Sequence, residues 1–311
     1  MKRSIFAMPV FVISAPLLVS LGITAAPDRD REYVVSPETA GAIEEAAPEV
    51  APAKPARPRK VLVYGRVPTH PESVACCFTA MEVLGRKTGA FEATSSGDPA
   101  LFLPESLRRF DAVVMNNTHE RTPMLPWDFE QLTPQEQAAA KEREPLCTKS
   151  LVDFVASGGG LVGIHGATAI RDELKELAQM YGGQIMGHRG GIWWIKPEEP
   201  MHPLCAPLGG QSFEVRDEIY VFRKPLSREP MSREGVRVLL SLDLGKTEDP
   251  GLRTDGDYAI SWIRNFGKGR VFYCTLGHAK TAYTNPMVMK HLLAGIQFAT
   301  GDLPADATPR P

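Results

Sequence analysis

The stretch of sequence that decides the fold spans residues 157–168 and reads SGGGLVGIHGAT. Its apolar centre, residues 160–164, is typical of a strand in a parallel sheet, because such strands are buried on both faces. Ligands of open α/β sheets bind at the carboxyl ends of the strands. We therefore expect His165, which directly follows the apolar run, to face a binding crevice.

A sharp turn from strand to helix often presents a serine or cysteine nucleophile in hydrolases and amidotransferases. In this chain the corresponding position holds His165, and the sequence contains neither G-x-S-x-G nor G-x-C-x-G. The sequence therefore excludes a serine hydrolase of this type and a glutamine amidotransferase. Acid–base or ligand-binding work by a histidine is the remaining interpretation.

Bulk composition restricts the class of partner. The chain has 311 residues, of which 43% are hydrophobic and 23% are charged, as in a folded globular protein. Its formal net charge of −2 provides no electrostatic field that would attract nucleic acid or an anionic membrane. We expect a small, nearly neutral molecule as partner, and a homo-oligomer is left open.

The amino-terminal residues 1–26 have the pattern of a secretory signal peptide. Lys2 and Arg3 precede the apolar residues 5–23, and small residues follow at 24–26. An uncleaved membrane anchor is the competing interpretation, because the apolar stretch is near the lower length limit for a membrane span. We expect cleavage, a periplasmic or secreted protein, and no membrane association afterwards.

Two further segments are predicted to lie outside the folded domain. Residues 27–59 are rich in proline and alanine and have few large apolar side chains, so we expect a disordered linker. The folded domain is predicted at 60–303, and residues 304–311 are predicted to form a disordered tail.

Strands and helices alternate along the first half of the domain. Strand patterns occur at 61–65, 91–94, 111–117 and 160–164, and helix patterns begin near residues 71, 133, 151 and 174. The segment 119–147 is predicted to be an insertion that bears a helix and partly covers the crevice. Strand patterns dominate the second half, before a final helix at 286–296: 191–195, 212–215, 236–240, 258–262 and 269–274. This order predicts a three-layer α/β/α sandwich with an antiparallel β extension.

Three histidines directly follow predicted strands: His70, His165 and His278. They would meet in one crevice if their strands are neighbours that point the same way. A core histidine bonded to backbone is the alternative for His165. The other four histidines are assigned separately: His188 to a glycine-rich loop at 186–191 that allows close approach to a ligand, His119 to the mouth of the insertion, His202 to a structural turn and His291 to the surface of the last helix.

Asp217 and Glu218 form a charged pair inside an otherwise apolar segment. Neighbouring residues of a strand point to opposite faces, so only one of the two carboxylates can face a pocket. We favour Glu218, and a solvated surface pair is the alternative. Asn117 and Thr118 end the third strand and are predicted to bind substrate, although a local Asx turn explains them nearly as well.

A divalent metal ion is the one cofactor that the residue types allow. Histidine with aspartate or glutamate suits zinc and similar ions. The chain contains neither H-E-x-x-H nor H-x-H, so the ligands would have to come from separate loops. No cofactor is therefore assigned, and metal binding is left open.

The chain resembles the ThuA-like family, which is named for trehalose utilisation and is related in fold to class I glutamine amidotransferases. The resemblance covers residues 60–303. Its marks are the glycine-rich run 158–165, the D-E-I-Y motif at 217–220, and the segments 259–262, 267–273 and 276–278. His70 matches the first loop of the family. Ile219, where the family often has tryptophan, and the long insertion at 119–147 depart from the pattern.

The resemblance implies a flavodoxin-like sandwich and a role with sugars, including 3-keto-glycosides. A ketone acidifies the neighbouring C–H, and a histidine can remove that proton near neutral pH. We expect a lyase or hydrolase in which His165 or His278 is the base, assisted by His70. Glu218 is expected to orient a group or act as the acid, and Asn117, a second histidine or a metal would stabilise the enolate oxygen. The remaining predicted substrate-binding residues are Thr118, His188, Asp217 and Tyr220.

A non-catalytic, secreted sugar-binding module is the alternative function. Aromatic side chains form the platforms on which sugars stack, and four are candidates here: Trp127, Trp193, Trp194 and Tyr283. Trp193 and Trp194 are neighbours on a predicted strand, so only one of them can face a ligand.

Overall fold

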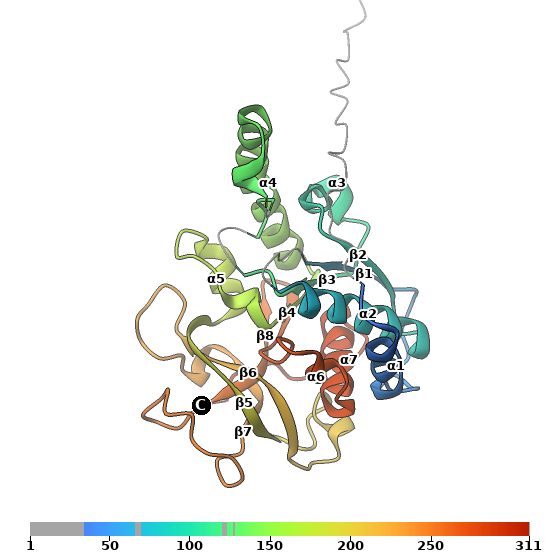
Figure 1. The fold of residues 1–311 in the computed structure, drawn as a ribbon, viewed down its shortest axis with the longest axis vertical. Coiled ribbons are helices and arrows are strands. Elements are labelled where there is room, and N and C mark those ends of the chain that lie inside the picture. Colours follow the sequence, from blue (N-terminus) through green and yellow to red (C-terminus); the bar gives the residue numbers. More distant parts are fainter. Residues whose placement is uncertain (1–33, 66–69, 120–122, 127, 311) are drawn as a thin grey trace, which may run out of the picture. The chain divides into compact units, whose positions relative to one another are not determined.

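A mixed sheet of nine strands organises the part of the chain that the computed structural model describes, residues 34–65, 70–119, 123–126 and 128–310. The strand order is β2-β1-β3-β4-β9-β8-β7-β5-β6 (Figure 1). The predicted signal peptide and Trp127 lie outside the described residues. Among the helices that are described, none is both long and apolar enough to span a membrane.

Five parallel strands form the half of the sheet that carries the predicted histidines. Their order, β2-β1-β3-β4-β9, is that of a flavodoxin-like sheet, so the predicted fold class is confirmed. β3 and β4 are buried along their whole length because helices cover both faces. The strands are β1 (Lys60–Tyr64), β2 (Glu92–Ser96), β3 (Ala112–Asn116), β4 (Gly160–Ile164) and β9 (Gly269–Cys274).

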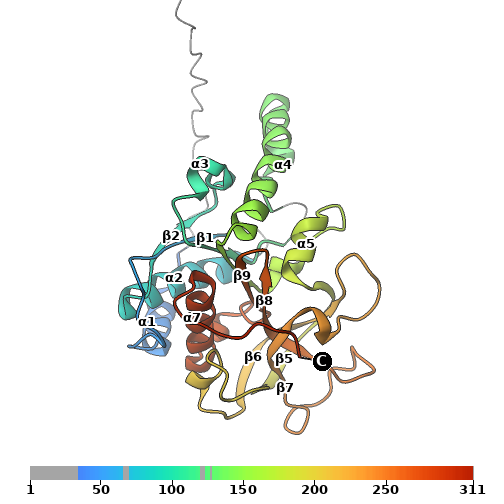
Figure 2. The same ribbon diagram turned by 180° about the vertical axis from the view of Figure 1, so that it is seen from behind.

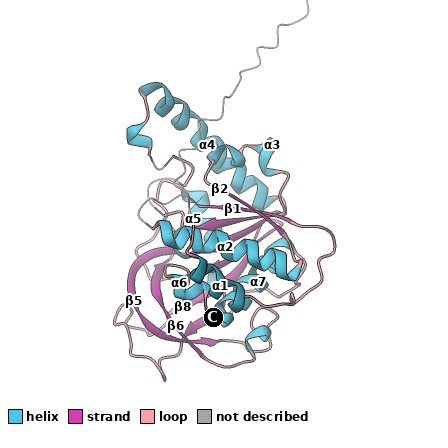
Figure 3. Ribbon diagram, turned by 45° about the vertical axis from the view of Figure 1, so that its right-hand side comes forward, coloured by secondary structure: helices cyan, strands magenta, loops and turns pink. Residues whose placement is uncertain are grey.

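Helices pack on both faces of this parallel half (Figure 3). α1 (Pro37–Ala46), α2 (Pro71–Thr88) and α7 (Pro286–Thr300) share one apolar core with the sheet. α4 (Pro134–Ala156) and α5 (Lys175–Tyr181) share the core on the opposite face. The shorter helices are α3 (Pro104–Leu107), α6 (Lys280–Tyr283) and the 3₁₀ turns Pro99–Phe102, Phe129–Gln131, His165–Thr168, Ala206–Leu208 and Arg233–Gly235.

The antiparallel extension consists of β5 (Gln184–Pro197), β6 (Phe213–Arg223), β7 (Arg237–Leu242) and β8 (Ala259–Phe266). β5 is much longer than predicted and curves strongly (Figure 3). It includes 186–191, for which a glycine-rich loop was predicted wrongly. Pairing with β6 places His188 opposite Tyr220, and such long-range pairing overrides the weak strand propensity of glycine.

The insertion and the following helix form one continuous element, α4. Two separate helices were predicted, but α4 begins at the capping box of Thr133 and Glu136 and runs through Pro145, which is exposed. Its first half extends away from the sheet in both views (Figures 1 and 2). Whether the insertion covers the crevice stays a prediction, because residues 120–122 and 127 lie outside the described part.

Residues 37–59 are ordered, which corrects the disordered linker predicted for 27–59. Ser36 caps α1, and Ile43 is fully buried in the core shared with α2 and α7. Gln297 on α7 bonds both backbone groups of Ala53. Arg59 forms an ion pair with Asp302 at 2.6 Å. Amino-acid composition does not indicate this packing, because backbone amides and polar side chains, rather than large apolar residues, attach the segment to the domain.

The carboxyl-terminal residues 304–310 are also ordered, in contrast to the predicted tail at 304–311. Asp306 forms an ion pair with Arg237 at 2.8 Å, and Ala307 is buried. His202 donates to the backbone oxygen of Asp306, in agreement with its predicted structural role. These polar contacts are long-range, so local composition does not indicate them.

His291 was predicted at the surface of the last helix and is instead buried. Its Nδ1–H donates to the carbonyl of Leu204, and its Nε2 accepts from the Ser261 hydroxyl at 2.7 Å. Burial lowers the pKa of His291 to about 4, so the ring is neutral. The face of α7 that carries His291 packs on the sheet, and a polar residue there is satisfied by these two bonds.

Candidate functional site

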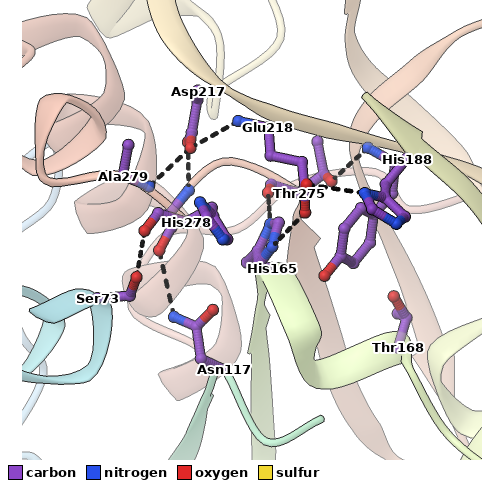
Figure 4. A network of polar contacts seen from close by, with 12 residues as sticks. Ser73, Asn117, His165, Thr168, His188, Asp217, Glu218, Thr275, His278 and Ala279 are labelled. Atoms are coloured by element: carbon purple, nitrogen blue, oxygen red, sulfur yellow. Dashed lines mark hydrogen bonds and ion pairs between the residues drawn. The ribbon is translucent and has the colours of Figure 1, made fainter. Parts of the chain in front are cut away.

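The sheet brings the three predicted strand ends together. β4 pairs in parallel with β9, and β3 lies between β1 and β4. The ring centroids of His165 and His278 are 5.0 Å apart, and those of His70 and His278 are 4.9 Å apart. The predicted convergence of the three imidazoles is therefore confirmed, and it occurs at the carboxyl edge of the parallel strands. Figure 4 shows His165 and His278 at this edge, with Glu218 beside them.

His165 is held in one orientation and one tautomer. It is 1% exposed, and its Nδ1 lies 2.7 Å from the carbonyl oxygen of Thr275. A carbonyl only accepts, so Nδ1 carries the hydrogen and Nε2 has the lone pair in the neutral ring. Its backbone φ is 46°, which is uncommon for a residue with a side chain and often marks a functional site.

The phenol of Tyr273 supports this strained corner. Its hydroxyl donates to the backbone oxygen of His165 at 2.7 Å and accepts from Thr168 at 3.0 Å. On the other side, the ring of Tyr220 lies 4.2 Å from the imidazole of His165 between centroids. Tyr220 was predicted to bind substrate. Its ring is buried and forms a wall for His165.

Glu218 faces the histidines, as predicted from the alternation along the strand. One carboxylate oxygen lies 3.3 Å from His165 Nε2, and the other lies 2.8 Å from His188 Nδ1. Burial acts to raise the pKa of Glu218, but the hydrogen bonds from the two histidines and the charges of His165 and His278 lower it to about 2. Glu218 is therefore ionised at neutral pH. It can orient a group or bind a cation, and the lowered pKa disfavours its expected alternative role as general acid.

Asp217 points to the opposite side of β6 and is 3% exposed. Its carboxylate accepts three backbone N–H bonds, from Gly277 at 2.7 Å and from Ala279 and Glu218 at 2.8 Å. Burial raises the pKa of Asp217 to about 6, against the charge of His165 and these three bonds. Substrate binding was predicted for Asp217, but it binds the loop that carries His278 and so positions that histidine.

The loop at 277–279 needs a glycine at its first position. Gly277 has φ of 136°, which side-chain-bearing residues rarely adopt, and an added Cβ would lie 2.6 Å from Ile164. Ser73 at the start of α2 donates to the carbonyl of His278. His278 itself is partly buried, and burial followed by the charge of His165 lowers its pKa, so its neutral form is favoured at neutral pH.

His70 occupies the amino-terminal cap of α2 but makes no side-chain capping bond. Its ring lies between those of His119 and His278, with both centroids at 4.9 Å. His188 comes from β5, and its side chain is 61% exposed. The cluster is therefore reachable from solvent on the side of His188 and closed by β4 and β9 on the side of His165.

Asn117 and Thr118 are buried next to the loop of His278. The amide nitrogen of Asn117 donates to Asn116 and to the carbonyl of Gly277, so it has no donor left for an enolate oxygen. Asn117 Oδ1 and Thr118 Oγ1 are buried without a hydrogen-bond partner among the described residues. Buried polar atoms are almost always bonded, and no Asx-turn bond satisfies these two oxygens among the described residues.

Sequence reasoning missed Thr275 and Ser73, which act on the two central histidines through backbone carbonyl groups. Thr275 provides the acceptor for His165, and Ser73 bonds the carbonyl of His278. A backbone carbonyl is present at every position, so no residue type could have indicated the contact of Thr275. Ser73 follows His70 closely in sequence, but a serine in the first turn of a helix does not by itself indicate a contact with the site.

One set of side chains can hold a metal ion. Ligand atoms of His165, Glu218 and His278 all lie within 4.8 Å of one another. The three residues come from the end of β4, from β6 and from the loop after β9. The ligands thus come from separate elements, as the absence of a compact metal motif requires.

The aromatic platforms expected for a binding module are largely unavailable. Trp193 is 5% exposed and donates its indole N–H to the backbone of Asp217. Tyr283 is fully buried and bonds the carbonyl of Gly277. The face of Trp194 is occupied by Lys246, 4.9 Å from the ring centroid.

Comparisons with known proteins agree with the fold. Two crystal structures of ThuA-like proteins are similar to this chain. The protein from Bacteroides uniformis ATCC 8492 is 19% identical with a TM-score of 0.59, over 80% of this chain and 94% of that one. The protein from Parabacteroides merdae ATCC 43184 is 16% identical with a TM-score of 0.55, over 82% and 98%. A search of the curated proteins finds no matching sequence. Residues 60–299 match the model of the family described as ThuA, trehalose utilisation, and the chain therefore belongs to the ThuA family.

Proposed function

We propose that this protein is a carbohydrate-processing enzyme that acts by acid–base chemistry on a keto-glycoside, as a lyase or hydrolase. The observation that carries the proposal is the meeting of His70, His165 and His278 with the ionised Glu218 at one edge of the sheet. The description of the family, trehalose utilisation, supports a glycoside as substrate.

The chemistry needs a base, a stabilised oxygen and a departing alcohol. In a 3-keto-glycoside, the C2–H bond is acidified by the ketone, and an imidazole removes that proton. The electron pair forms an enolate, which then expels the glycosidic oxygen from C1. That oxygen takes up a proton and leaves as an alcohol, and the sugar is left as an unsaturated ketone. Addition of water across the double bond completes a hydrolysis.

His70 is the best placed base. The Nε2 lone pair of His165 is already directed at Glu218, so it is not free to take a proton from substrate carbon. His70 thus replaces His165 as the proposed base. His70 is partly exposed and its ring neighbours that of His278. An N–H group of the neighbouring His278 can then donate to the keto oxygen and stabilise the enolate.

Two buried oxygens are available to bind the sugar ring. Asn117 Oδ1 and Thr118 Oγ1 have no partner among the described residues and lie beside the loop that carries His278. Sugar hydroxyl groups would satisfy them. This assigns Asn117 as an acceptor for substrate, in place of its expected role as a donor to the enolate.

The test is product analysis after incubation of the purified protein with glucosides and their 3-keto derivatives. We expect turnover of the keto compounds alone, and we expect His70→Gln to lower kcat at least about 100-fold, as loss of a general base does. His202→Gln, which alters a histidine at the carboxyl-terminal contact, is the matched control and retains activity. Saturable binding without product from any compound would favour the sugar-binding module instead.

We further propose that the protein acts in the periplasm or outside the cell. The support is the charged, apolar and small-residue pattern of residues 1–26. A glycoside-processing enzyme in that compartment would meet its substrate before uptake. Fractionation of cells that express the full chain tests this location.

A further inference from the structure

Ligand atoms of His165 and Glu218 lie close to each other, beside His278. Because Nδ1 of His165 donates to Thr275, Nε2 of the neutral ring presents a lone pair. That nitrogen lies 3.3 Å from a carboxylate oxygen of Glu218. Two acceptors at this distance repel each other unless a proton or a cation lies between them. The arrangement therefore points to a positively charged ligand.

The distance fits a metal ion better than a hydrogen bond. A charge-assisted bond from an imidazolium to a carboxylate is about 2.7–2.9 Å long. Two ligand atoms bound to one tetrahedral zinc ion at about 2.05 Å are about 3.3 Å apart. The observed 3.3 Å between His165 Nε2 and Glu218 Oε2 equals this edge. The third ligand atom, on His278, lies within 4.8 Å of the other two.

We propose that His165, Glu218 and His278 bind one divalent transition-metal ion of the zinc class. Two imidazoles and one carboxylate form a donor set that zinc uses in catalytic sites, where a fourth position stays open for water or substrate. The inference deepens the proposed function and rests on it, because the open position would receive the keto oxygen. A divalent ion there would polarise the ketone and stabilise the enolate.

Contacts outside the three ligands fit the same role. Metal-binding histidines usually donate their other ring nitrogen to a carbonyl or carboxylate, as His165 does to Thr275. His188 donates to the second oxygen of Glu218 at 2.8 Å and so fixes that carboxylate. Asp217 and Ser73 hold the backbone on both sides of His278. Each ligand is thus oriented by a partner that does not itself bind the ion.

Metal binding is tested directly, with untagged full-length protein freed of metal by dialysis against a chelator. We expect one Zn²⁺ per chain by elemental analysis after reloading, and intense visible absorption bands when Co²⁺ replaces zinc. Glu218→Gln keeps the shape of the side chain and removes its charge, and His278→Gln removes a ligand. Both should weaken Zn²⁺ binding by more than about 100-fold, the upper range for loss of an outer partner.

Two control variants separate this site from general binding. Glu214→Gln changes an exposed carboxylate on the same strand, and His202→Gln changes a histidine at the carboxyl-terminal contact. Both should bind Zn²⁺ like the parent protein. Circular dichroism confirms that every variant is folded. Equal binding by Glu218→Gln and by the parent, or no binding by the parent, would overturn the proposal.

The outcomes distinguish this inference from the proposed function. Failure of the parent protein to bind Zn²⁺, together with turnover of the keto-glycoside, would refute the metal site and leave the acid–base function intact. Stoichiometric, Glu218-dependent Zn²⁺ binding without turnover of any glycoside would support the metal site and refute the function.

Discussion

Replacing Gly163 by alanine should destabilise the protein and disturb the corner that holds His165. Gly163 lies in β4, two residues before the histidine. A Cβ added there would lie 2.5 Å from a ring carbon of Tyr181 and 2.9 Å from a ring carbon of Tyr273. Both rings are fully buried, so neither can move into solvent. Overpacking of this kind costs about 1–3 kcal/mol.

Displacement of Tyr273 adds a second cost. Its hydroxyl donates to the backbone oxygen of His165 at 2.7 Å. Loss of such a bond costs about 0.5–1.5 kcal/mol. We therefore expect Gly163→Ala to lower the free energy of unfolding by about 1.5–4.5 kcal/mol. The proposed turnover should fall as well, because the strained backbone of His165 loses its support.

Urea unfolding followed by circular dichroism measures the change, and Gly190→Ala is the matched control. Gly190 also lies in a strand, has no positive φ, and has open space where a Cβ would be added. Its replacement should change the free energy of unfolding by no more than about 0.5 kcal/mol, as at most surface sites. Equal stability of the two variants would refute the packing argument.

Three further predictions test the parts of the chain that attach to the domain. Gly41 lies inside α1, with open space where a Cβ would be added. Gly41→Ala should therefore stabilise the protein by about 0.5–1 kcal/mol in urea unfolding. No change would mean that α1 does not fold with the domain. Burial acts to raise the pKa of Asp302, but its bonds to Arg59 and to the backbone of Ala56 lower it on balance. A carboxyl group with a lowered pKa stabilises the fold above its ordinary pKa and loses that effect as the pH falls, so the stability difference between the parent and Asp302→Asn should shrink from pH 7 to pH 3. A constant difference would contradict the ion pair. For export, amino-terminal sequencing of the mature protein should begin at Pro27, and an intact Met1 on the exported protein would indicate a retained anchor.

Local patterns predicted the parallel half of the sheet well. Apolar runs such as 160–164 specify strands because both faces of a parallel sheet are buried. The alternation of these runs with helical patterns restricts the connections to a few topologies. The sequence therefore assigns His70, His165 and His278 to strand ends, whereas the sheet order brings those ends together.

The errors share one cause, which is that the deciding contacts join distant parts of the chain. Residues 186–191 form a strand because β6 pairs with them. Residues 37–59 are ordered because Gln297 and Asp302 bind them from α7 and its end. His291 is buried because its two polar partners come from β8 and from the turn before Ala206. Composition within a short window contains none of this information.

For the site, the sequence by itself determined which groups are present and where the chain places them. It puts an imidazole in place of a nucleophile at residue 165 and two more imidazoles after strands. It also puts one of two neighbouring carboxylates on the same side of the sheet as the imidazoles. Tertiary structure alone decided their chemistry. The carbonyl of Thr275 fixes the tautomer of His165, and Asp217 turns away to hold the loop of His278. Glu218 remains ionised between two imidazoles. The physical reason is that tautomer and charge depend on partners within a few ångströms, and folding brings those partners from elements far apart in the sequence.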